Sequence, residues 1–130
     1  MRKFAYIAIL IIIVCGAACS SPTREELAAL AAKGYYQHLI DGDYDHFVEG
    51  RVMADSLPVD YRSQLNDAYA QFLAQQFKSR GGIREVCVSR AFTDSTQNYT
   101  CVLLMLCYGD STTEEVVVPM IERDGRWMMK

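Results

Sequence analysis

The segment Cys101-Val102-Leu103-Leu104-Met105-Leu106-Cys107-Tyr108 is apolar at every position. A strand in an antiparallel sheet with one wet face alternates apolar and polar side chains. This segment therefore predicts a strand that is buried on both faces. The run Val116-Val117-Val118-Pro119-Met120-Ile121 repeats the pattern, so helices on one side cannot cover the sheet alone. We expect a partner subunit, strong sheet curvature or a bound apolar ligand to cover the other side.

The segments around this strand predict an α+β domain with three N-terminal helices packed on a curved, four-stranded antiparallel sheet. Helical spacing of apolar residues, a capping box at Thr23 and Glu26, and helix stops at glycines predict helices over 24–41, 44–49 and 58–80. Alternation and turn residues predict strands over 83–92, 99–108, 114–121 and 126–129. The connections between strands are too short for parallel crossovers, which favours antiparallel neighbours.

The third predicted helix carries an apolar stripe with helical spacing. Its members are Tyr61, Leu65, Ala68, Tyr69, Phe72, Leu73 and Phe77. Such a stripe normally packs into the core, and core packing is the structure we expect. The alternative is that its aromatic residues also line a cavity. Four aromatic residues are candidates to converge on a ligand there, namely Tyr36, Tyr69, Phe72 and Trp127.

Composition excludes several classes of protein. The chain has 130 residues, of which 51% are hydrophobic and 22% charged, with a formal net charge of −3. This is a globular composition without the basic patch that nucleic-acid binding requires. The motif Asp41-x-Asp43-x-Asp45 suggests calcium, but His46 replaces the required glycine and Val52 the bidentate glutamate. We therefore expect no metal and no cofactor, and we expect His38 and His46 to be surface groups on different helices.

The N-terminal segment predicts export and membrane anchoring. Arg2 and Lys3 precede an apolar run that is too short to span a bilayer, which is typical of a signal peptide over residues 1–18. The run Gly16-Ala17-Ala18-Cys19 resembles the lipobox of bacterial lipoproteins, although the motif usually has leucine where Gly16 stands. The resemblance implies lipidation of Cys19, a tether over 19–24, a domain over 25–130 and a location in the cell envelope. There the protein is expected to be anchored in the outer membrane, on its periplasmic or its surface side. The alternative is ordinary cleavage that leaves Cys19 as a free thiol.

The predicted domain resembles the nuclear-transport-factor-2-like superfamily and, within it, small bacterial lipoproteins of unknown function. The segments that carry the resemblance are Tyr36, Gly42-Asp43-Tyr44-Asp45, Phe47-Val48, Gly81-Gly82-Ile83, Tyr108-Gly109-Asp110, Glu114-Glu115, Val118-Pro119-Met120 and Gly125-Arg126-Trp127. They cover roughly Ala28 to Lys130, with Ser111 standing where a glycine is common. The resemblance implies a cone-shaped, cystatin-like fold whose sheet often dimerises and whose interior often holds a small molecule.

Three functions follow as hypotheses. The first is a non-catalytic domain that binds a small apolar ligand or a protein partner. The second is a structural homodimer formed through the sheet face, without a ligand. The third is an isomerase- or dehydratase-like enzyme, which requires a desolvated acid or base inside the cone. Glu85 is the only acidic residue well inside a predicted strand, and no catalytic motif occurs, so we expect no enzyme activity.

Cys87, Cys101 and Cys107 are an odd set for an exported protein, so at least one of them stays free. Cys101 and Cys107 lie on one strand, about 20 Å apart by strand rise, and cannot form a bridge with each other. A disulfide from Cys87 to either of them depends on the strand register. Otherwise all three are expected to fill the core as small apolar side chains.

Overall fold

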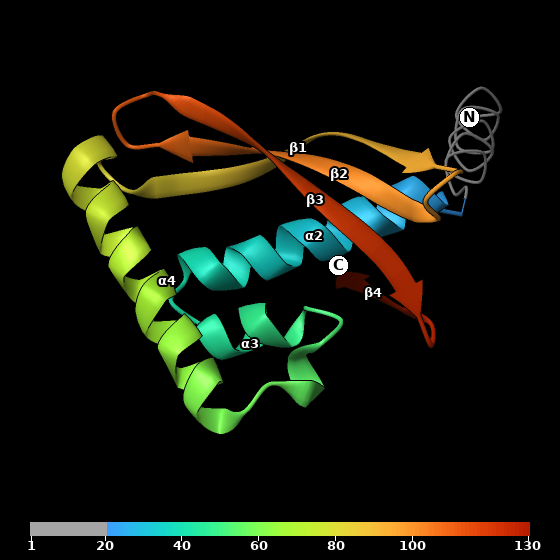
Figure 1. The fold of residues 1–130 in the computed structure, drawn as a ribbon. Helices are drawn as coiled ribbons and strands as arrows, with labels where there is room; N and C mark the ends of the chain where they lie inside the picture. Colours follow the sequence, from blue (N-terminus) through green and yellow to red (C-terminus); the bar gives the residue numbers. More distant parts are fainter. Residues whose placement is uncertain (1–20) are drawn as a thin grey trace, which may run out of the picture.

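The computed structural model describes residues 21–130. The predicted signal peptide and Cys19 lie outside the described residues. The described chain forms three α-helices and a short 3-10 helix, followed by a four-stranded sheet (Figure 1). The α+β class predicted from the sequence is therefore confirmed. None of the described helices is both long enough and apolar enough to cross a membrane.

The helices begin and end close to where the sequence predicts. They are α2 (Arg24–Ile40), α3 (Tyr44–Glu49), η1 (Ala54–Ser56) and α4 (Val59–Arg80). The capping box forms as expected, since the Thr23 hydroxyl accepts from the backbone N–H of Glu26 and the Glu26 carboxylate accepts from that of Thr23. The left-handed Gly81 ends α4. No sequence pattern predicts η1, which is a single turn.

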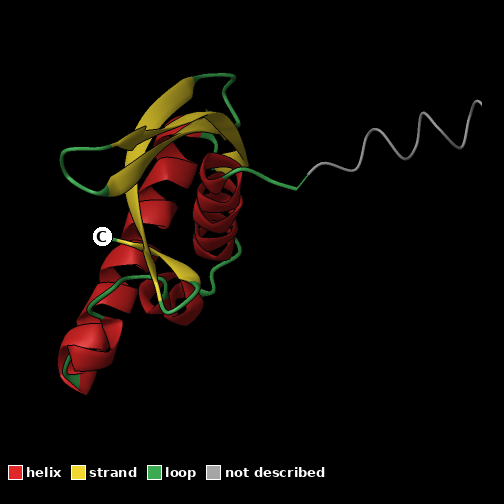
Figure 2. Ribbon diagram, turned by 90° about the vertical axis from the view of Figure 1, so that its right-hand side faces the viewer, coloured by secondary structure: helices red, strands yellow, loops and turns green. Residues whose placement is uncertain are grey.

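The sheet is an antiparallel meander in the order β1-β2-β3-β4. Its strands are β1 (Ile83–Asp94), β2 (Tyr99–Tyr108), β3 (Thr113–Arg123) and β4 (Arg126–Met129). Register shifts in β1, between Ile83 and Glu85 and between Val88 and Arg90, interrupt its pairing with β2. Such irregularities bend and twist a strand, and the sheet curves over α2 (Figure 2).

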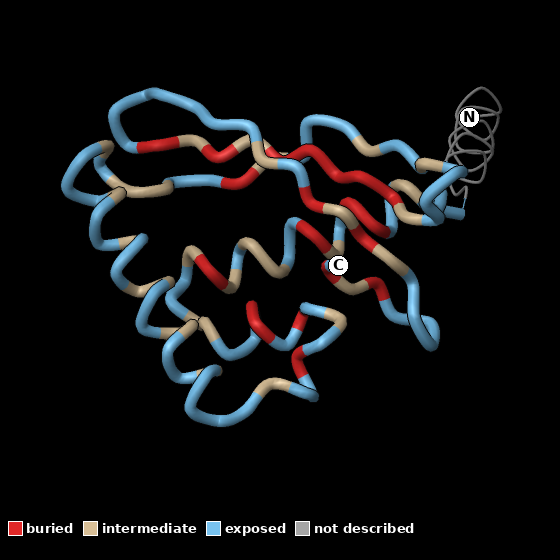
Figure 3. The backbone as a smooth tube through the Cα atoms, in the orientation of Figure 1, coloured by how far each residue is buried: buried red, intermediate tan, exposed pale blue. Residues whose placement is uncertain are grey.

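Strand β2 is dry on both faces, as its sequence predicts. Val102, Leu104 and Leu106 face the helices, and Leu103 on the opposite face is also buried. Figure 3 shows this burial as a nearly continuous red band along the central strand. On the outer face of β3, however, the described chain leaves Val117 60% exposed, so only a partner or a ligand could cover it. Side chains from the strands on either side shelter β2, whereas β3 has only the short β4 beyond it.

Helix α4 departs most from expectation. None of its residues is buried, although its apolar stripe predicts core packing. The helix leans away from the sheet at the side of the molecule (Figures 1 and 2) and is mostly exposed or half-buried along its length (Figure 3). Phe72 is 39% exposed and Phe77 is 72% exposed. The core-packing prediction therefore holds only in part, because Tyr69 and Leu73 pack against the core as half-buried side chains. Tyr69 and Phe72 also line a cavity, as the alternative predicts.

A close backbone contact ties the end of α4 to the β2–β3 turn. The Gly109 N–H donates to the Gly82 carbonyl at 2.9 Å, and the Asp110 N–H donates to the Arg80 carbonyl at 2.9 Å. A Cβ atom at position 109 would lie 2.5 Å from the Gly81 carbonyl oxygen. Only glycine therefore allows this approach, which holds one end of α4 to the sheet while the rest of the helix stands off.

The three cysteines of the sheet, Cys87, Cys101 and Cys107, are free thiols. Cys101 pairs with Phe92 across the ladder, well away from Cys87, which pairs with Met105. Cys101 is buried as an apolar filler, while Cys87 and Cys107 lie half-buried on the outer face beside Glu85.

Candidate functional site

A cavity of about 390 Å³ lies between α4, α2 and the sheet, in the space that α4 leaves by leaning outward. Its walls are largely apolar and come from every layer of the fold. The lining residues are Tyr36, Leu39, Phe47, Arg51, Ala68, Tyr69, Phe72, Ile83, Leu106, Glu114 and Val116. Its volume falls within the range of small-molecule sites.

Three of the four aromatic residues predicted from the sequence meet at this cavity. Tyr36 reaches it from α2, and Tyr69 and Phe72 reach it from α4. Trp127 does not, because β4 pairs with residues 120–123 of β3, whereas the cavity borders Glu114 and Val116 at the other end of that strand. Trp127 is instead buried, with the Arg24 guanidinium 5.2 Å from its ring centroid. Its carbonyl accepts a 2.6 Å hydrogen bond from the Tyr35 hydroxyl.

Phe47 joins the aromatic residues of the cavity into one packed group. Its ring makes edge-to-face contacts with Tyr36 at 5.3 Å and with Tyr69 at 5.0 Å between centroids. Desolvation raises the pKa of Tyr36 above its ordinary value, so the phenol stays neutral at physiological pH. The wall formed by Tyr36, Phe47 and Tyr69 is therefore aromatic and uncharged.

Arg51 is the cationic residue of the cavity, and no sequence motif marks it. The backbone around it pairs with β4, since the Val52 N–H donates to the Met129 carbonyl and the Met129 N–H to the Gly50 carbonyl. Its guanidinium donates to the Tyr69 hydroxyl at 3.3 Å. Arg62 and Arg80 each form an ion pair with a carboxylate. Among the described residues, no carboxylate lies within ion-pair distance of Arg51.

Arg51 and Tyr69 also border a second cavity of about 310 Å³. Its other lining residues are Val52, Met53, Leu57, Tyr61, Leu65 and Lys130. The two cavities therefore meet at the hydrogen bond between Arg51 and Tyr69. Arg51 borders both cavities, and Lys130 adds a second cation to the smaller one.

The opposite end of the larger cavity carries Glu114, whose charge is already paired. Its Oε2 accepts from the Tyr108 hydroxyl at 2.7 Å and from Arg80 Nη1 at 3.2 Å. The Arg80 guanidinium lies 3.9 Å from the Tyr108 ring centroid. Desolvation, followed by the hydrogen bond and charge of Glu114, raises the pKa of Tyr108. A carboxylate held in this way is a poor base for proton abstraction.

Glu85, the acidic residue that the sequence placed inside a strand, does not reach the cavity. It pairs with Cys107 on the outer face of the sheet and is exposed.

The sequence signal for a residue such as Arg51 is weak, because it lies in an irregular segment between two helices.

Comparison with known proteins supports the fold. No family model matches the sequence, and no curated protein matches it significantly. Among solved structures, the chain is similar to a Campylobacter jejuni protein described as a "Putative NTF2-like transpeptidase", with a TM-score of 0.60 and 13% sequence identity. The match covers 75% of this chain and 92% of that one. The described domain therefore has a nuclear-transport-factor-2-like fold.

Proposed function

We propose that this protein is a lipid-anchored envelope protein whose domain binds a small amphipathic molecule in the cavity under α4. The sequence around Cys19 supports the anchor, with residues 19–24 as tether and the outer membrane as the address. A lipidated cysteine holds a small domain at a membrane because each buried acyl CH₂ contributes about 0.8 kcal/mol. The domain itself then needs no membrane-binding surface.

The observation that carries the ligand proposal is the position of α4. The helix has an apolar stripe but no buried residue, so part of that stripe faces the cavity instead of a packed core. Burying apolar surface contributes roughly 25 cal/mol per Å². A ligand with an apolar body would gain this energy against Phe72, Leu106 and Val116, which line the cavity from α4 and the sheet.

The charges at the cavity support an anionic group on the ligand. Glu114 is paired with Arg80, whereas the Arg51 guanidinium has only the Tyr69 hydroxyl as a side-chain partner among the described residues. A ligand carboxylate at Arg51 would form a charge-assisted hydrogen bond. The ligand class is therefore a molecule with an apolar body and one carboxylate or similar anionic group.

Decanoate and decanol are suitable probes for a binding experiment by calorimetry. They have alkyl chains of similar length, but decanoate ends in an anionic carboxylate and decanol in a neutral hydroxyl. We expect saturable binding of decanoate to the wild type, and weaker binding of decanol. Arg51→Gln should weaken decanoate binding by about tenfold, since a hydrogen bond to a charged group is worth about 1.5 kcal/mol or more. It should leave decanol binding unchanged.

Lys33→Gln is the matched control, because it removes the same charge from an exposed position on α2 outside the cavity. Phe72→Ala should weaken both probes, because it removes part of the apolar wall. Equal loss of decanoate binding in Arg51→Gln and Lys33→Gln would contradict the proposal, and so would absence of saturable binding to the wild type.

The cavity's composition supports binding without catalysis. Transfer of an acyl group, as in a transpeptidase, requires an activated nucleophile such as serine or cysteine beside a base. The described residues that line the cavity include no serine, cysteine or histidine. The activity printed in the name of the Campylobacter jejuni protein is therefore not part of the proposal.

A second candidate function, homodimer formation through the outer face of the sheet, is favoured by the exposed Val117. Arg90, Leu103 and Val117 form one row across this face, and Glu115 lies in the neighbouring row. In a two-fold dimer, Arg90 of each copy can meet Glu115 of the other. This face therefore offers one exposed apolar side chain, Val117, together with side chains of opposite charge at Arg90 and Glu115.

Val117→Asp tests the dimer by sedimentation. We expect the wild type to sediment as a dimer and Val117→Asp as a monomer, because a buried unpaired carboxylate is costly. Val59→Asp is the control, since Val59 is 84% exposed on α4 and away from the sheet. A wild-type monomer would remove this candidate and leave the ligand proposal in place.

A further inference from the structure

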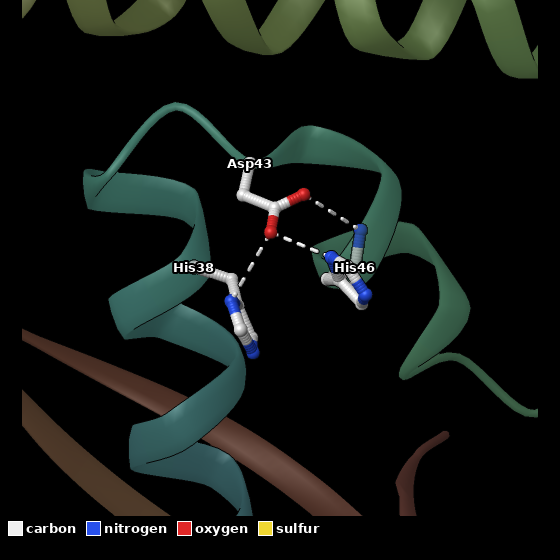
Figure 4. A group of neighbouring side chains, drawn as sticks. All are labelled: His38, Asp43 and His46. Atoms are coloured by element: carbon white, nitrogen blue, oxygen red, sulfur yellow. Dashed lines mark hydrogen bonds and ion pairs between the residues drawn. The ribbon is translucent and has the colours of Figure 1, made fainter.

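The turn between α2 and α3 brings two histidines and an aspartate together (Figure 4). His38 lies in the last turn of α2, Asp43 is the N-cap of α3, and His46 follows in its first turn. The turn is tight because Gly42 adopts a φ of +82° and the Asp43 N–H donates to the His38 carbonyl at 2.8 Å. This turn therefore brings the side chains of His38, Asp43 and His46 close together.

Both imidazoles turn the same nitrogen toward one carboxylate oxygen. The Nδ1 atom lies 3.5 Å from Asp43 Oδ2 in His38 and 2.5 Å from it in His46. The two rings are stacked with centroids 5.1 Å apart. All three potential ligand atoms lie within 4.8 Å of one another. The group is thus compact enough for one ion to contact all three residues.

This spacing is close to what a metal ion needs. Ligand atoms at about 2.0–2.2 Å from a tetrahedral ion are roughly 3.4 Å from each other. The separation of His38 Nδ1 from Asp43 Oδ2 already fits, and that of His46 must open by about 1 Å to accept an ion. The three side chains are 40–61% exposed, so this rotation meets little resistance.

The donor set selects the class of metal. Two imidazole nitrogens and one carboxylate suit zinc and similar transition ions, whereas calcium and magnesium prefer oxygen ligands only. Three protein ligands leave one position for water. Asp41 and Asp45 flank the group in sequence and add negative charge that favours a cation.

We propose that His38, Asp43 and His46 form a binding site for a zinc-class ion that links the end of α2 to the start of α3. The proposal is independent of the ligand cavity. A bound ion would nevertheless affect the cavity, because α3 carries Phe47 and leads into the segment with Arg51, and both residues line it. An ion at this site would restrain both residues through the backbone of α3.

The test is a zinc chloride titration of the full chain with a chromophoric chelator as competitor. Asp43→Asn is the most informative variant, because asparagine retains an oxygen that caps α3 while the anionic ligand is lost. We expect Asp43→Asn and His46→Ala each to weaken zinc binding by at least about tenfold. Removing a residue that only hydrogen-bonds a metal ligand already costs about that much, and these two residues would bind the ion directly. Asp41→Asn, which removes the same charge from a neighbouring exposed residue, should bind zinc like the wild type.

Histidine ring NMR signals give a second readout, since the chain has only 2 histidines. At a zinc concentration that just saturates the wild type, both signals should shift in the wild type and shift much less in Asp43→Asn. Glu85, Cys87 and Cys107 form another group of possible ligands on the sheet, so the variant Cys87→Ser/Cys107→Ser is titrated in parallel. Zinc binding that disappears in this double variant but persists in Asp43→Asn would overturn the proposal, as would a wild type whose histidine signals do not respond.

Discussion

Gly109→Ala is expected to lower the free energy of unfolding by about 2–4 kcal/mol, combining overpacking against backbone with the loss of hydrogen bonds. The new Cβ would lie 2.5 Å from the Gly81 carbonyl oxygen, and backbone atoms cannot rotate away as a side chain can. The two hydrogen bonds from residues 109 and 110 to the end of α4 would lengthen or break. Because α4 has no buried residue of its own, this contact and the Arg80–Glu114 ion pair are important attachments of its C-terminal end to the sheet. Denaturant unfolding measures the change.

Two other glycines provide matched controls for the same substitution. A Cβ at Gly34, inside α2, meets nothing within 4 Å, so Gly34→Ala should stabilise the protein by about 0.5–1 kcal/mol through helix propensity. Gly125 also has open space but a φ of +77°, so Gly125→Ala should cost about 1–2 kcal/mol from backbone strain. Gly109 has no positive φ, which isolates the clash. A Gly109→Ala variant as stable as wild type would show that α4 does not depend on this contact.

Phe47→Ala is expected to cost about 3–5 kcal/mol, the range for removing a buried aromatic side chain. Phe47 is 2% exposed and holds Tyr36 and Tyr69 in edge-to-face contact. Its loss joins an internal void to the ligand cavity and frees both tyrosine rings. Thermal or denaturant unfolding measures the stability, and the decanoate titration shows whether the enlarged cavity still binds.

Phe72→Ala is the contrasting variant, because Phe72 lines the same cavity but is 39% exposed. We expect it to cost less than about 1.5 kcal/mol, since little packed surface is lost. Phe47→Leu keeps much of the volume and should cost less than Phe47→Ala. Equal destabilisation by Phe47→Ala and Phe72→Ala would mean that α4 packs against the core more tightly than the structure shows.

Most of the element boundaries could be predicted from the sequence, because they depend on local chemistry. The capping box at Thr23, the stop at Gly81 and the uninterrupted apolar run of β2 all act within a few residues of chain. The register of β1 against β2 was not predicted, because two irregularities in β1 shift it and depend on tertiary packing. Lipidation of Cys19 remains a prediction, since that residue lies outside the described part of the chain.

The candidate sites were only partly predictable. Tyr36, Tyr69 and Phe72 were recognised as aromatic residues on apolar helix faces, whereas Arg51 lies in a segment without periodicity and Trp127 was expected at a cavity that it does not reach. The grouping of His38 with His46 depends on how one turn folds two helices together. Sequence spacing alone placed them apart.

Local sequence patterns were enough to predict the α-helices and strands of this chain and which of their faces are apolar. The distance of α4 from the sheet, and with it how much of its stripe borders a cavity, depends on how the elements pack. The physical reason is that periodicity records the direction of an apolar face but not the distance to its partner. That distance is set by contacts between residues far apart in the chain, such as Gly81 with Gly109 and Arg51 with Tyr69.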